Sequence, residues 1–391
     1  MKMNKNLFLL TLSQVFGFTA ATITVFLSGI IGSQITSIKF LSTLPTALYV
    51  VGTAIFTILA AKIMSKVGRR LGFIFSAFGS SAASLLGAFA ISQQNFILFC
   101  VSCLILGMGA AFNHQYRFAA AESVEKEKAP KAISILMFAG IVAAFLGISS
   151  ANYTKNLIPD HLYVGSYLIL AAFTFMPAIF LFFYKNNEET KIDINNKYNG
   201  RRLFEIISQP RFFQAVIASA FAYAVMSYLM TATPMSMHLM EKMSLEKTGL
   251  VLQFHVAAMF LPSLITGNLI KKFGHSNVIY IGVLFLVVTI ILSLFEQTYS
   301  NYMVALIFLG LGWNFLFISG TSLVVLTYKE EEKFKAQGVN DLIVFSTMAL
   351  ASLSAGISLS LTSWTTMNLV CIPFLILIVY SSFRADILSK K

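Results

Sequence analysis

Charge is scarce in this sequence. Only 11% of its 391 residues are Asp, Glu, Lys or Arg, whereas 57% are hydrophobic. A soluble core of this size cannot bury that much apolar surface. The composition therefore excludes a soluble protein and predicts an integral membrane protein.

Cysteines and acidic residues are also few, which excludes several kinds of site. Cys100, Cys103 and Cys371 all lie in apolar runs, so the Cys-x-x-Cys pair lacks the polar loop and the second pair of a zinc site. The sequence has no nucleotide-binding glycine-rich loop, no metal-ligand cluster and no Ser/His/Asp arrangement in a soluble domain. We therefore expect no enzyme, no cofactor and no metal. The net charge of +12 comes from short basic clusters between apolar runs, which is not the pattern of a nucleic-acid-binding surface.

Long apolar runs are what the sequence has in abundance. Twelve of them have the length of a membrane-spanning helix, and they predict an all-α membrane protein with twelve transmembrane helices. The runs fall near residues 7–31, 38–61, 71–91, 96–120, 131–152, 163–184, 212–236, 249–270, 277–295, 301–326, 338–361 and 365–383.

Basic residues indicate how these helices are oriented. Positive residues concentrate in the cytoplasmic loops of membrane proteins. With a cytoplasmic N-terminus, every Lys and Arg apart from Arg117 falls at a cytoplasmic segment except Lys39, Lys155, Lys242 and Lys247. We therefore expect both termini in the cytoplasm.

Internal repeats divide the chain into two halves. The longest polar stretch, Lys185 to Pro210, separates the sixth run from the seventh. AKIMSKVGRRLGFIF recurs as GNLIKKFGHSNVIYI, LGMGAAF as LGLGWNF, and FLGIS as SAGIS. These repeats align, at nearly constant separation, Gly68 with Gly274, Gly107 with Gly310, and Gly147 with Gly356. The pattern predicts two pseudo-symmetric six-helix bundles, at 1–184 and 212–391, joined by a cytoplasmic loop at 185–211.

Two six-helix halves and a repeated basic turn resemble the major facilitator superfamily of secondary transporters. In that family the turn after the second helix is similar to G-x-x-x-D-R-x-G-R-R, and the matching positions here are Ala61, Ser65, Lys66, Gly68, Arg69 and Arg70. Ser65 replaces an Asp that helps to latch the two halves in the family, and Asp341 at the start of the eleventh run is a candidate to supply this carboxylate. The resemblance implies a cytoplasmic gate made of Lys66, Gly68, Arg69, Arg70 and Asp341.

The resemblance also implies a function. We expect a monomeric transporter in the bacterial inner membrane, in contact with membrane lipid, that moves a small organic solute by alternating access and is coupled to protons. Drug/proton antiporters of the family often carry an acid in helix 1 and a Gly-Pro pair in helix 5, whereas this chain has Gln14 and Gly147-Ile148. An uncoupled facilitator, an efflux permease and a non-transporting receptor of the same fold are the alternatives.

The fourth run, ILGMGAAFNHQYRFAAAE at 105–122, contains Arg117, the one cation inside a predicted span. A charge at the centre of a lipid-facing helix costs roughly 2.5–3.5 kcal/mol. Gly109, Asn113 and Arg117 share one helical face, so we expect that face to line a cavity. There Arg117 would bind a carboxylate or phosphate. The alternative is that Arg117 reaches the headgroups or pairs with Glu122.

Helices 1, 4, 7 and 10 line the central cavity in this family, and their mid-span polar and aromatic residues are therefore the candidates for solute binding. These residues are Gln14, Thr22, Asn113, Arg117, Tyr223, Ser227, Trp313, Asn314 and Phe317. The aromatic rings would stack on an aromatic solute, with plain packing as the alternative. Proton coupling needs a titratable group, for which the candidates are His114, His255, Glu122 and Asp341.

Overall fold

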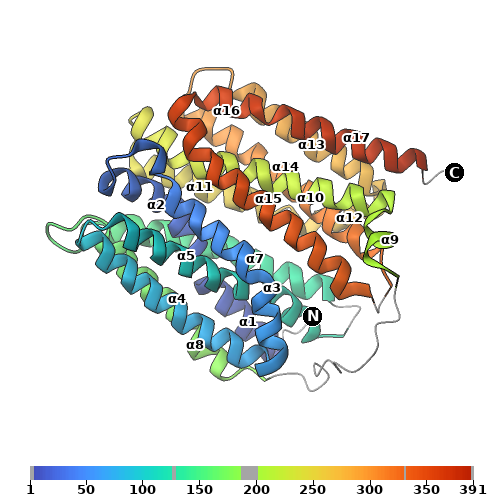
Figure 1. The fold of residues 1–391 in the computed structure, drawn as a ribbon, viewed down its shortest axis with the longest axis horizontal. Coiled ribbons are helices and arrows are strands. Elements are labelled where there is room, and N and C mark those ends of the chain that lie inside the picture. The colour runs from blue at the N-terminus through green and yellow to red at the C-terminus, as the bar shows by residue number, and fades with distance from the viewer. Residues whose placement is uncertain (1–3, 126–128, 186–200, 330–331, 389–391) are drawn as a thin grey trace. The chain divides into compact units, whose positions relative to one another are not determined.

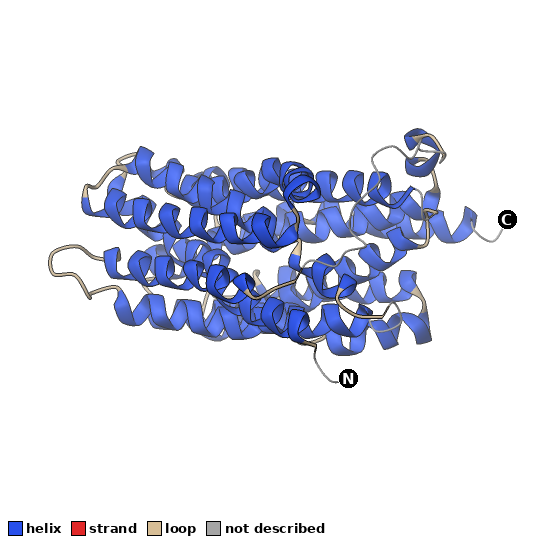
Figure 2. Cartoon of the chain, turned by 90° about the horizontal axis from the view of Figure 1, so that it is seen from below, coloured by secondary structure: helices blue, strands red, loops and turns tan. Residues whose placement is uncertain are grey.

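The computed structural model describes residues 4–125, 129–185, 201–329 and 332–388. Within these ranges every regular element is a helix and none is a strand (Figure 2). The elements are α1 (Lys5–Gly17), α2 (Thr19–Ile35), η1 (Lys39–Leu41), α3 (Leu44–Val67), α4 (Arg69–Ser92), α5 (Phe96–Asn113), α6 (Tyr116–Glu122), α7 (Ala129–Thr154), α8 (Val164–Phe182), α9 (Leu203–Ile207), α10 (Pro210–Met235), η4 (Ser236–Met240), α11 (Leu245–Phe260), α12 (Ser263–Phe273), α13 (His275–Leu292), α14 (Tyr299–Val325), α15 (Lys333–Leu361), α16 (Trp364–Val370) and α17 (Ile372–Leu388).

The membrane spans agree in number with the sequence prediction. Eleven helical segments of the described chain are long and apolar enough to cross a membrane. The pair α11–α12, bent by 40°, makes a twelfth span. The prediction of an all-α protein with twelve spans is therefore confirmed.

Four of the predicted runs are broken helices, which the sequence analysis missed. The breaks lie at Phe18, at residues 114–115, at residues 261–262 and at Cys371. Pro262 and Pro373 account for two of them, because proline has no N–H to donate and is best tolerated at the start of a helix.

The chain divides into two compact units. Unit 1 contains Met1–Ile192 and Thr231–Ala257, and unit 2 contains Asp193–Met230 and Ala258–Lys391. The boundary cuts α10 and α11, so each of these helices belongs partly to both units. The division into bundles at 1–184 and 212–391 stays a prediction, and most of the predicted loop, residues 186–200, lies outside the described residues.

Glycines bring two helices of unit 1 into backbone contact. In this unit α4 packs along α5 and α8, and α3 packs along α5 (Figure 1). A Cβ atom on Gly107 of α5 would lie 1.9 Å from the carbonyl oxygen of Tyr49 on α3, and one on Gly52 would lie 2.3 Å from that of Leu104. Thr53 Oγ1 donates a hydrogen bond of 3.1 Å to the Gly107 carbonyl across the same contact. This is the close approach that small residues permit between membrane helices.

The two repeated basic turns share one backbone conformation. Gly68 joins α3 to α4 with φ 84° and ψ 157°, and Gly274 joins α12 to α13 with φ 83° and ψ 162°. This region of φ/ψ space is essentially restricted to glycine. The two turns are therefore structurally equivalent, as the sequence repeat predicts.

The end of the central loop is a folded element rather than a linker. Arg201 donates to the Glu332 carboxylate from its backbone N–H (2.8 Å), Nε (2.8 Å) and Nη2 (2.6 Å). The backbone N–H of Lys329 donates to the same carboxylate at 2.9 Å. Just after this ion pair, α9 buries Ile206 against Leu323 at the end of α14. These contacts hold residues 201–207 on the connection between α14 and α15.

The Arg201–Glu332 pair predicts an acid-sensitive contribution to stability. Hydrogen bonds from Arg201 and from the Lys329 backbone hold the pKa of the Glu332 carboxyl well below its usual range. A carboxyl with a lowered folded-state pKa stabilises the fold above its unfolded-state pKa, and this stability is lost as the pH falls through the folded-state value. We expect Glu332→Gln to lower the melting temperature at pH 7 and the difference from wild type to shrink below about pH 5. Glu246→Gln, at an exposed position on α11, is the control, and a wild-type advantage that stays constant down to pH 4 would contradict the assignment.

Candidate functional site

Asn113 links two helix breaks in unit 1. It is the last residue of α5, and its Nδ2 donates a hydrogen bond of 3.2 Å to the carbonyl oxygen of Gly17, the last residue of α1. Gln14 lies one turn before Gly17 on α1 and is 9% exposed. Its Oε1 is buried and accepts no hydrogen bond from any described residue. The structure thus brings Gln14 and Asn113, both predicted from sequence, to the same helix break.

Arg117 lies on the short helix α6, beyond the break at residues 114–115, and its side chain is half-buried. The predicted stripe of Gly109, Asn113 and Arg117 is wrong at Gly109. A Cβ atom there would lie 2.0 Å from Ser80 Oγ on α4, so this glycine faces a neighbouring helix and not a cavity. The helix break also interrupts the regular spacing between Asn113 and Arg117.

The basic turn is held by an acid of the same unit. Arg69 donates to Glu122 from Nε (2.8 Å) and from Nη2 (2.5 Å), which is the two-pronged geometry that arginine makes with carboxylates. Glu122 therefore gives Arg69 the carboxylate that Ser65 cannot provide. Its role in proton coupling stays a prediction.

The other gate residues have simpler surroundings. Arg70 donates to the carbonyl of Phe182 at the end of α8, and its guanidinium lies 5.1 Å from the centre of the Phe182 ring. Lys66 is exposed at the end of α3. The side chains of Ala61 and Ser65 lie outside what the structure describes. Asp341, in unit 2, accepts a hydrogen bond of 3.1 Å from Asn340 Nδ2, and its place in the gate stays a prediction.

The two candidate histidines occupy different surroundings in unit 1. His114 directly follows α5, and its backbone N–H donates to the carbonyl of Ala110. His255 on α11 is fully buried. Two residues before it, Gln253 Nε2 donates 2.9 Å to Ser149 Oγ on α7, which fixes this part of α11 within the unit.

Unit 2 contains an aromatic cluster centred on Trp313 and Tyr223. The Trp313 ring stacks on Phe317 with a centroid distance of 5.0 Å and an angle of 17°. Tyr223 meets Trp313 edge-on at 5.1 Å and Phe317 at 4.8 Å. Phe260 meets Trp313 at 6.0 Å, and Phe345 meets Tyr223 at 5.9 Å. Helices α10, α11, α14 and α15 each contribute a ring, so residues far apart in sequence form one buried aromatic cluster.

The indole of Trp313 has an unused hydrogen-bond donor. This residue is only 1% exposed, and its Nε1 has no acceptor among the described residues. Buried indole N–H groups usually find a partner, because an unsatisfied donor costs free energy. An acceptor on a bound solute would satisfy this one.

Asn314 was predicted to contact the solute, but the structure gives its side chain partners within the protein. Its side chain is fully buried and accepts a hydrogen bond of 2.7 Å from Thr266 Oγ1. Its Nδ2 donates to the Met259 carbonyl (2.6 Å) and to Ser263 Oγ (2.8 Å). Both amide hydrogens are used, so Asn314 stabilises the break between α11 and α12 and has no donor left for a solute.

The described ranges contain no cluster of metal-ligating side chains. No three His, Cys, Asp or Glu side chains there lie close enough together to hold a metal ion. Cys100, Cys103 and Cys371 are all buried and form no disulfide.

Comparisons with known proteins extend over nearly the whole chain. The family model described as Major Facilitator Superfamily matches residues 7–291 and 216–386. Riboflavin transporter RfnT of Brucella anthropi is 35% identical over 375 residues, covering 96% of this chain and 94% of the relative. The uncharacterized MFS-type transporter YdeG of Bacillus subtilis is 27% identical over 384 residues, which cover 94% of this chain and 88% of YdeG.

Two solved structures share the fold at low identity. The nucleoside transporter NupG matches with a TM-score of 0.73 and 15% identity. The match covers 98% of this chain and 100% of the NupG chain. A bacterial homologue of the human lysosomal transporter Spinster, in an inward-facing and occupied conformation, matches with a TM-score of 0.73 and 13% identity. The match covers 97% of this chain and 96% of the homologue.

Proposed function

Because the chain belongs to the major facilitator superfamily, a family of membrane transporters and not of enzymes, we propose that it carries a small solute with a flat aromatic ring system. Riboflavin is the first compound to test. The family and the twelve spans make this a multi-pass membrane transporter, and the identity of the solute is the proposal.

The observation that carries this proposal is the buried, unpartnered indole N–H of Trp313 within the aromatic cluster of unit 2. The fused rings of riboflavin present flat faces to stack on aromatic side chains, and their carbonyl oxygens accept hydrogen bonds. Ligand sites typically combine such an apolar lining with a few placed polar groups. The Brucella anthropi relative, named as a riboflavin transporter, supports the same solute class.

Unit 1, taken by itself, contains polar candidates for contact with the solute. Gln14 has a buried acceptor without a partner, and Asn113 and Arg117 supply donors near the same helix breaks. Riboflavin carries hydroxyl groups and no charge, so Arg117 would act on it as a donor. On a phosphorylated flavin, Arg117 would also supply the opposite charge.

We further propose transport by alternating access, driven by a proton gradient and located in the bacterial inner membrane with both termini cytoplasmic. The titratable candidates are His114, Glu122, His255 and Asp341. The test is uptake of labelled riboflavin by proteoliposomes with and without an inward proton gradient. Faster uptake with the gradient supports coupling, and equal uptake favours a facilitator. Absence of both uptake and counterflow from well-folded protein would refute riboflavin as the solute.

Substitutions of Arg117 test whether the polar residues of unit 1 contribute to solute binding. We expect Arg117→Ala to raise the KM for riboflavin about tenfold or more, because hydrogen bonds to charged groups contribute about 1.5–3 kcal/mol. Arg117→Lys keeps the charge but loses the planar fork of donors, so its KM should fall between those of Arg117→Ala and wild type. The KM is measured by initial uptake rates, and flavin mononucleotide is added as a competitor.

Competition by flavin mononucleotide separates the two contributions of Arg117, its hydrogen-bond donors and its positive charge. If the guanidinium contributes its charge, Arg117→Ala will weaken competition by flavin mononucleotide more than it weakens riboflavin uptake. An unchanged KM and unchanged competition in folded Arg117→Ala would remove this residue from the site. Lys271→Ala, which removes an exposed positive charge that belongs to neither proposed site, is the control.

A further inference from the structure

The end of unit 2 that contains α9 has two arginines whose side chains bind no other residue that the structure describes. The arginines at this end of unit 2 are Arg201, Arg202, Arg211 and Arg384. The structure commits two of them elsewhere, since Arg201 pairs with Glu332 and Arg211 Nη1 pairs with Asp386 at 2.7 Å. Arg202 and Arg384 remain, and neither side chain makes a hydrogen bond or an ion pair with any described residue.

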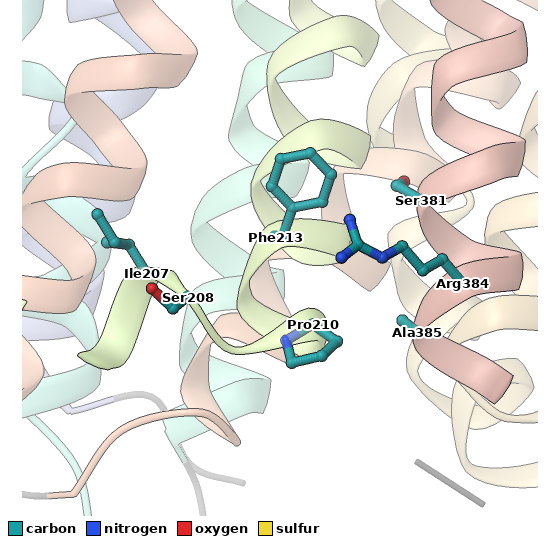
Figure 3. A pocket seen from close by; sticks show the side chains of 7 residues that line it. All are labelled: Ile207, Ser208, Pro210, Phe213, Ser381, Arg384 and Ala385. Carbon is teal, nitrogen blue, oxygen red and sulfur yellow. The ribbon is translucent and has the colours of Figure 1, made fainter. Parts of the chain in front are cut away.

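Arg384 lines a small cavity between α9, α10 and α17. The cavity has a volume of about 140 Å³, the space of about four or five water molecules. Figure 3 shows the Arg384 guanidinium extending from α17 toward α10, beside the Phe213 ring, with Ser208 and Pro210 on the far side. The walls are Ile207, Ser208, Pro210, Phe213, Ser381, Arg384 and Ala385.

The position of this cavity along the spans places it at the surface of a membrane. Pro210 is the first residue of one span, and Arg384 lies one turn before Leu388, the last residue of another. A hydrocarbon core needs about 20 residues of helix, and both spans are longer than that, so their ends extend into the headgroup region. Arginine at such a position reaches the interface with its charged head.

Exposed apolar side chains directly follow Arg202 on α9. On α9, Leu203 is 42% exposed and Phe204 is 75% exposed, while Ile206 is fully buried and anchors the helix to unit 2. Arg202 directly precedes this pair. The same helix contributes Ile207 to the wall of the Arg384 cavity. Exposed apolar side chains and cations at one end of the unit match a phospholipid, which joins a negative phosphate to apolar chains.

We propose that this end of unit 2 is a binding site for an anionic phospholipid. Arg384 holds the headgroup phosphate in the cavity, Arg202 adds a second positive charge, and Phe204 and Leu203 contact the acyl chains near the headgroup. Guanidinium groups bind phosphate through paired hydrogen bonds. The site is independent of the proposed solute, because it uses none of the residues assigned to solute binding.

The test is a lipid titration of the purified full-length protein in an uncharged detergent. The measurement is the phosphatidylglycerol concentration at which half of the rise in melting temperature is reached. Each basic residue near an anionic surface contributes about 1 kcal/mol, or about fivefold in affinity. We therefore expect about fivefold higher midpoints for Arg384→Ala and for Arg202→Ala. Arg384→Lys keeps the charge but loses the paired donors, so its midpoint should lie between those of Arg384→Ala and wild type. Lys271→Ala, which removes an exposed charge elsewhere on unit 2, is the control and should leave the midpoint unchanged.

Three results would overturn the proposal. The first is an unchanged midpoint in both Arg384→Ala and Arg202→Ala. The second is an equal midpoint for uncharged phosphatidylcholine, since the site requires a net negative headgroup. The third is an equal rise produced by inorganic phosphate alone, which would make this a site for free phosphate. Because the midpoint is read separately from the lipid-free melting temperature, a less stable variant still gives an answer.

Discussion

Replacing Trp313 by alanine is expected to lower the kcat/KM for riboflavin about thirtyfold or more, because truncating a buried tryptophan at a binding site costs about 2 kcal/mol or more. The indole contacts the rings of Tyr223, Phe260 and Phe317 and has the one buried ring donor in this cluster without an acceptor. The alanine variant therefore loses both the stacking surface and the hydrogen bond to the solute.

Trp313→Phe separates these two contributions. Phenylalanine keeps a ring in the cluster but has no N–H, so the KM should rise only about two- to tenfold, the worth of one hydrogen bond. Removing a large buried side chain also costs about 3–5 kcal/mol of stability, so the amount of folded protein must be measured for each variant. Trp364→Phe is the control, because Trp364 is equally buried and packs on Tyr302, away from this cluster. Equal loss of transport in Trp313→Phe and Trp364→Phe would show that Trp313 acts through packing alone.

Gly107→Ala is expected to be the most damaging single-methyl change in unit 1. The added Cβ would lie 1.9 Å from the Tyr49 carbonyl oxygen, and this obstacle is backbone, so it cannot rotate away as a side chain could. Overpacking costs about 1–3 kcal/mol and occasionally more. We expect a melting temperature lower by roughly 5 °C or more, less protein in the membrane, and loss of the hydrogen bond from Thr53 to Gly107.

Gly79→Ala on α4 provides the matched comparison. A Cβ atom at Gly79 would meet no atom within 4 Å, so the same added methyl has space. Its melting temperature should equal or slightly exceed that of wild type, since alanine is the better helix former by about 1 kcal/mol. If Gly107→Ala and Gly79→Ala have the same melting temperature, the close contact between α3 and α5 is not a determinant of stability.

The features that the sequence predicted well depend on composition and on local spacing. The apolar runs gave the twelve spans because a bilayer requires a fixed helix length. The turn at Gly68 and its repeat at Gly274 could be paired because a positive φ selects glycine strongly. Tyr223 and Trp313 were named as site candidates because they are an aromatic pair in helices that line the cavity in the family, and the structure places their rings in contact.

The features that were missed depend on what lies beside each residue. Gly109 and Asn113 share a helical face in sequence, but Gly109 packs on Ser80 of α4 while Asn113 reaches Gly17 of α1. In the sequence, Asn314 is a polar residue in the middle of a span. Only its three hydrogen-bond partners show that it stabilises the break between α11 and α12. A polar residue in a membrane span needs a partner, and the sequence does not say whether the protein or a solute provides it.

The sequence by itself determined that this chain is an all-helical membrane protein of the major facilitator type, because hydrophobic length and charge position are properties of the chain. Only the tertiary structure decided which polar groups remain available to ligands. Arg201, Arg211 and Glu122 form ion pairs with partners 131, 175 and 53 residues away. The indole N–H of Trp313 and the guanidinium of Arg384 have no hydrogen-bond partner among the residues that the structure describes. The physical reason is that satisfying a buried or interfacial polar group depends on distances of about 3 Å in space, and separation along the chain does not fix those distances.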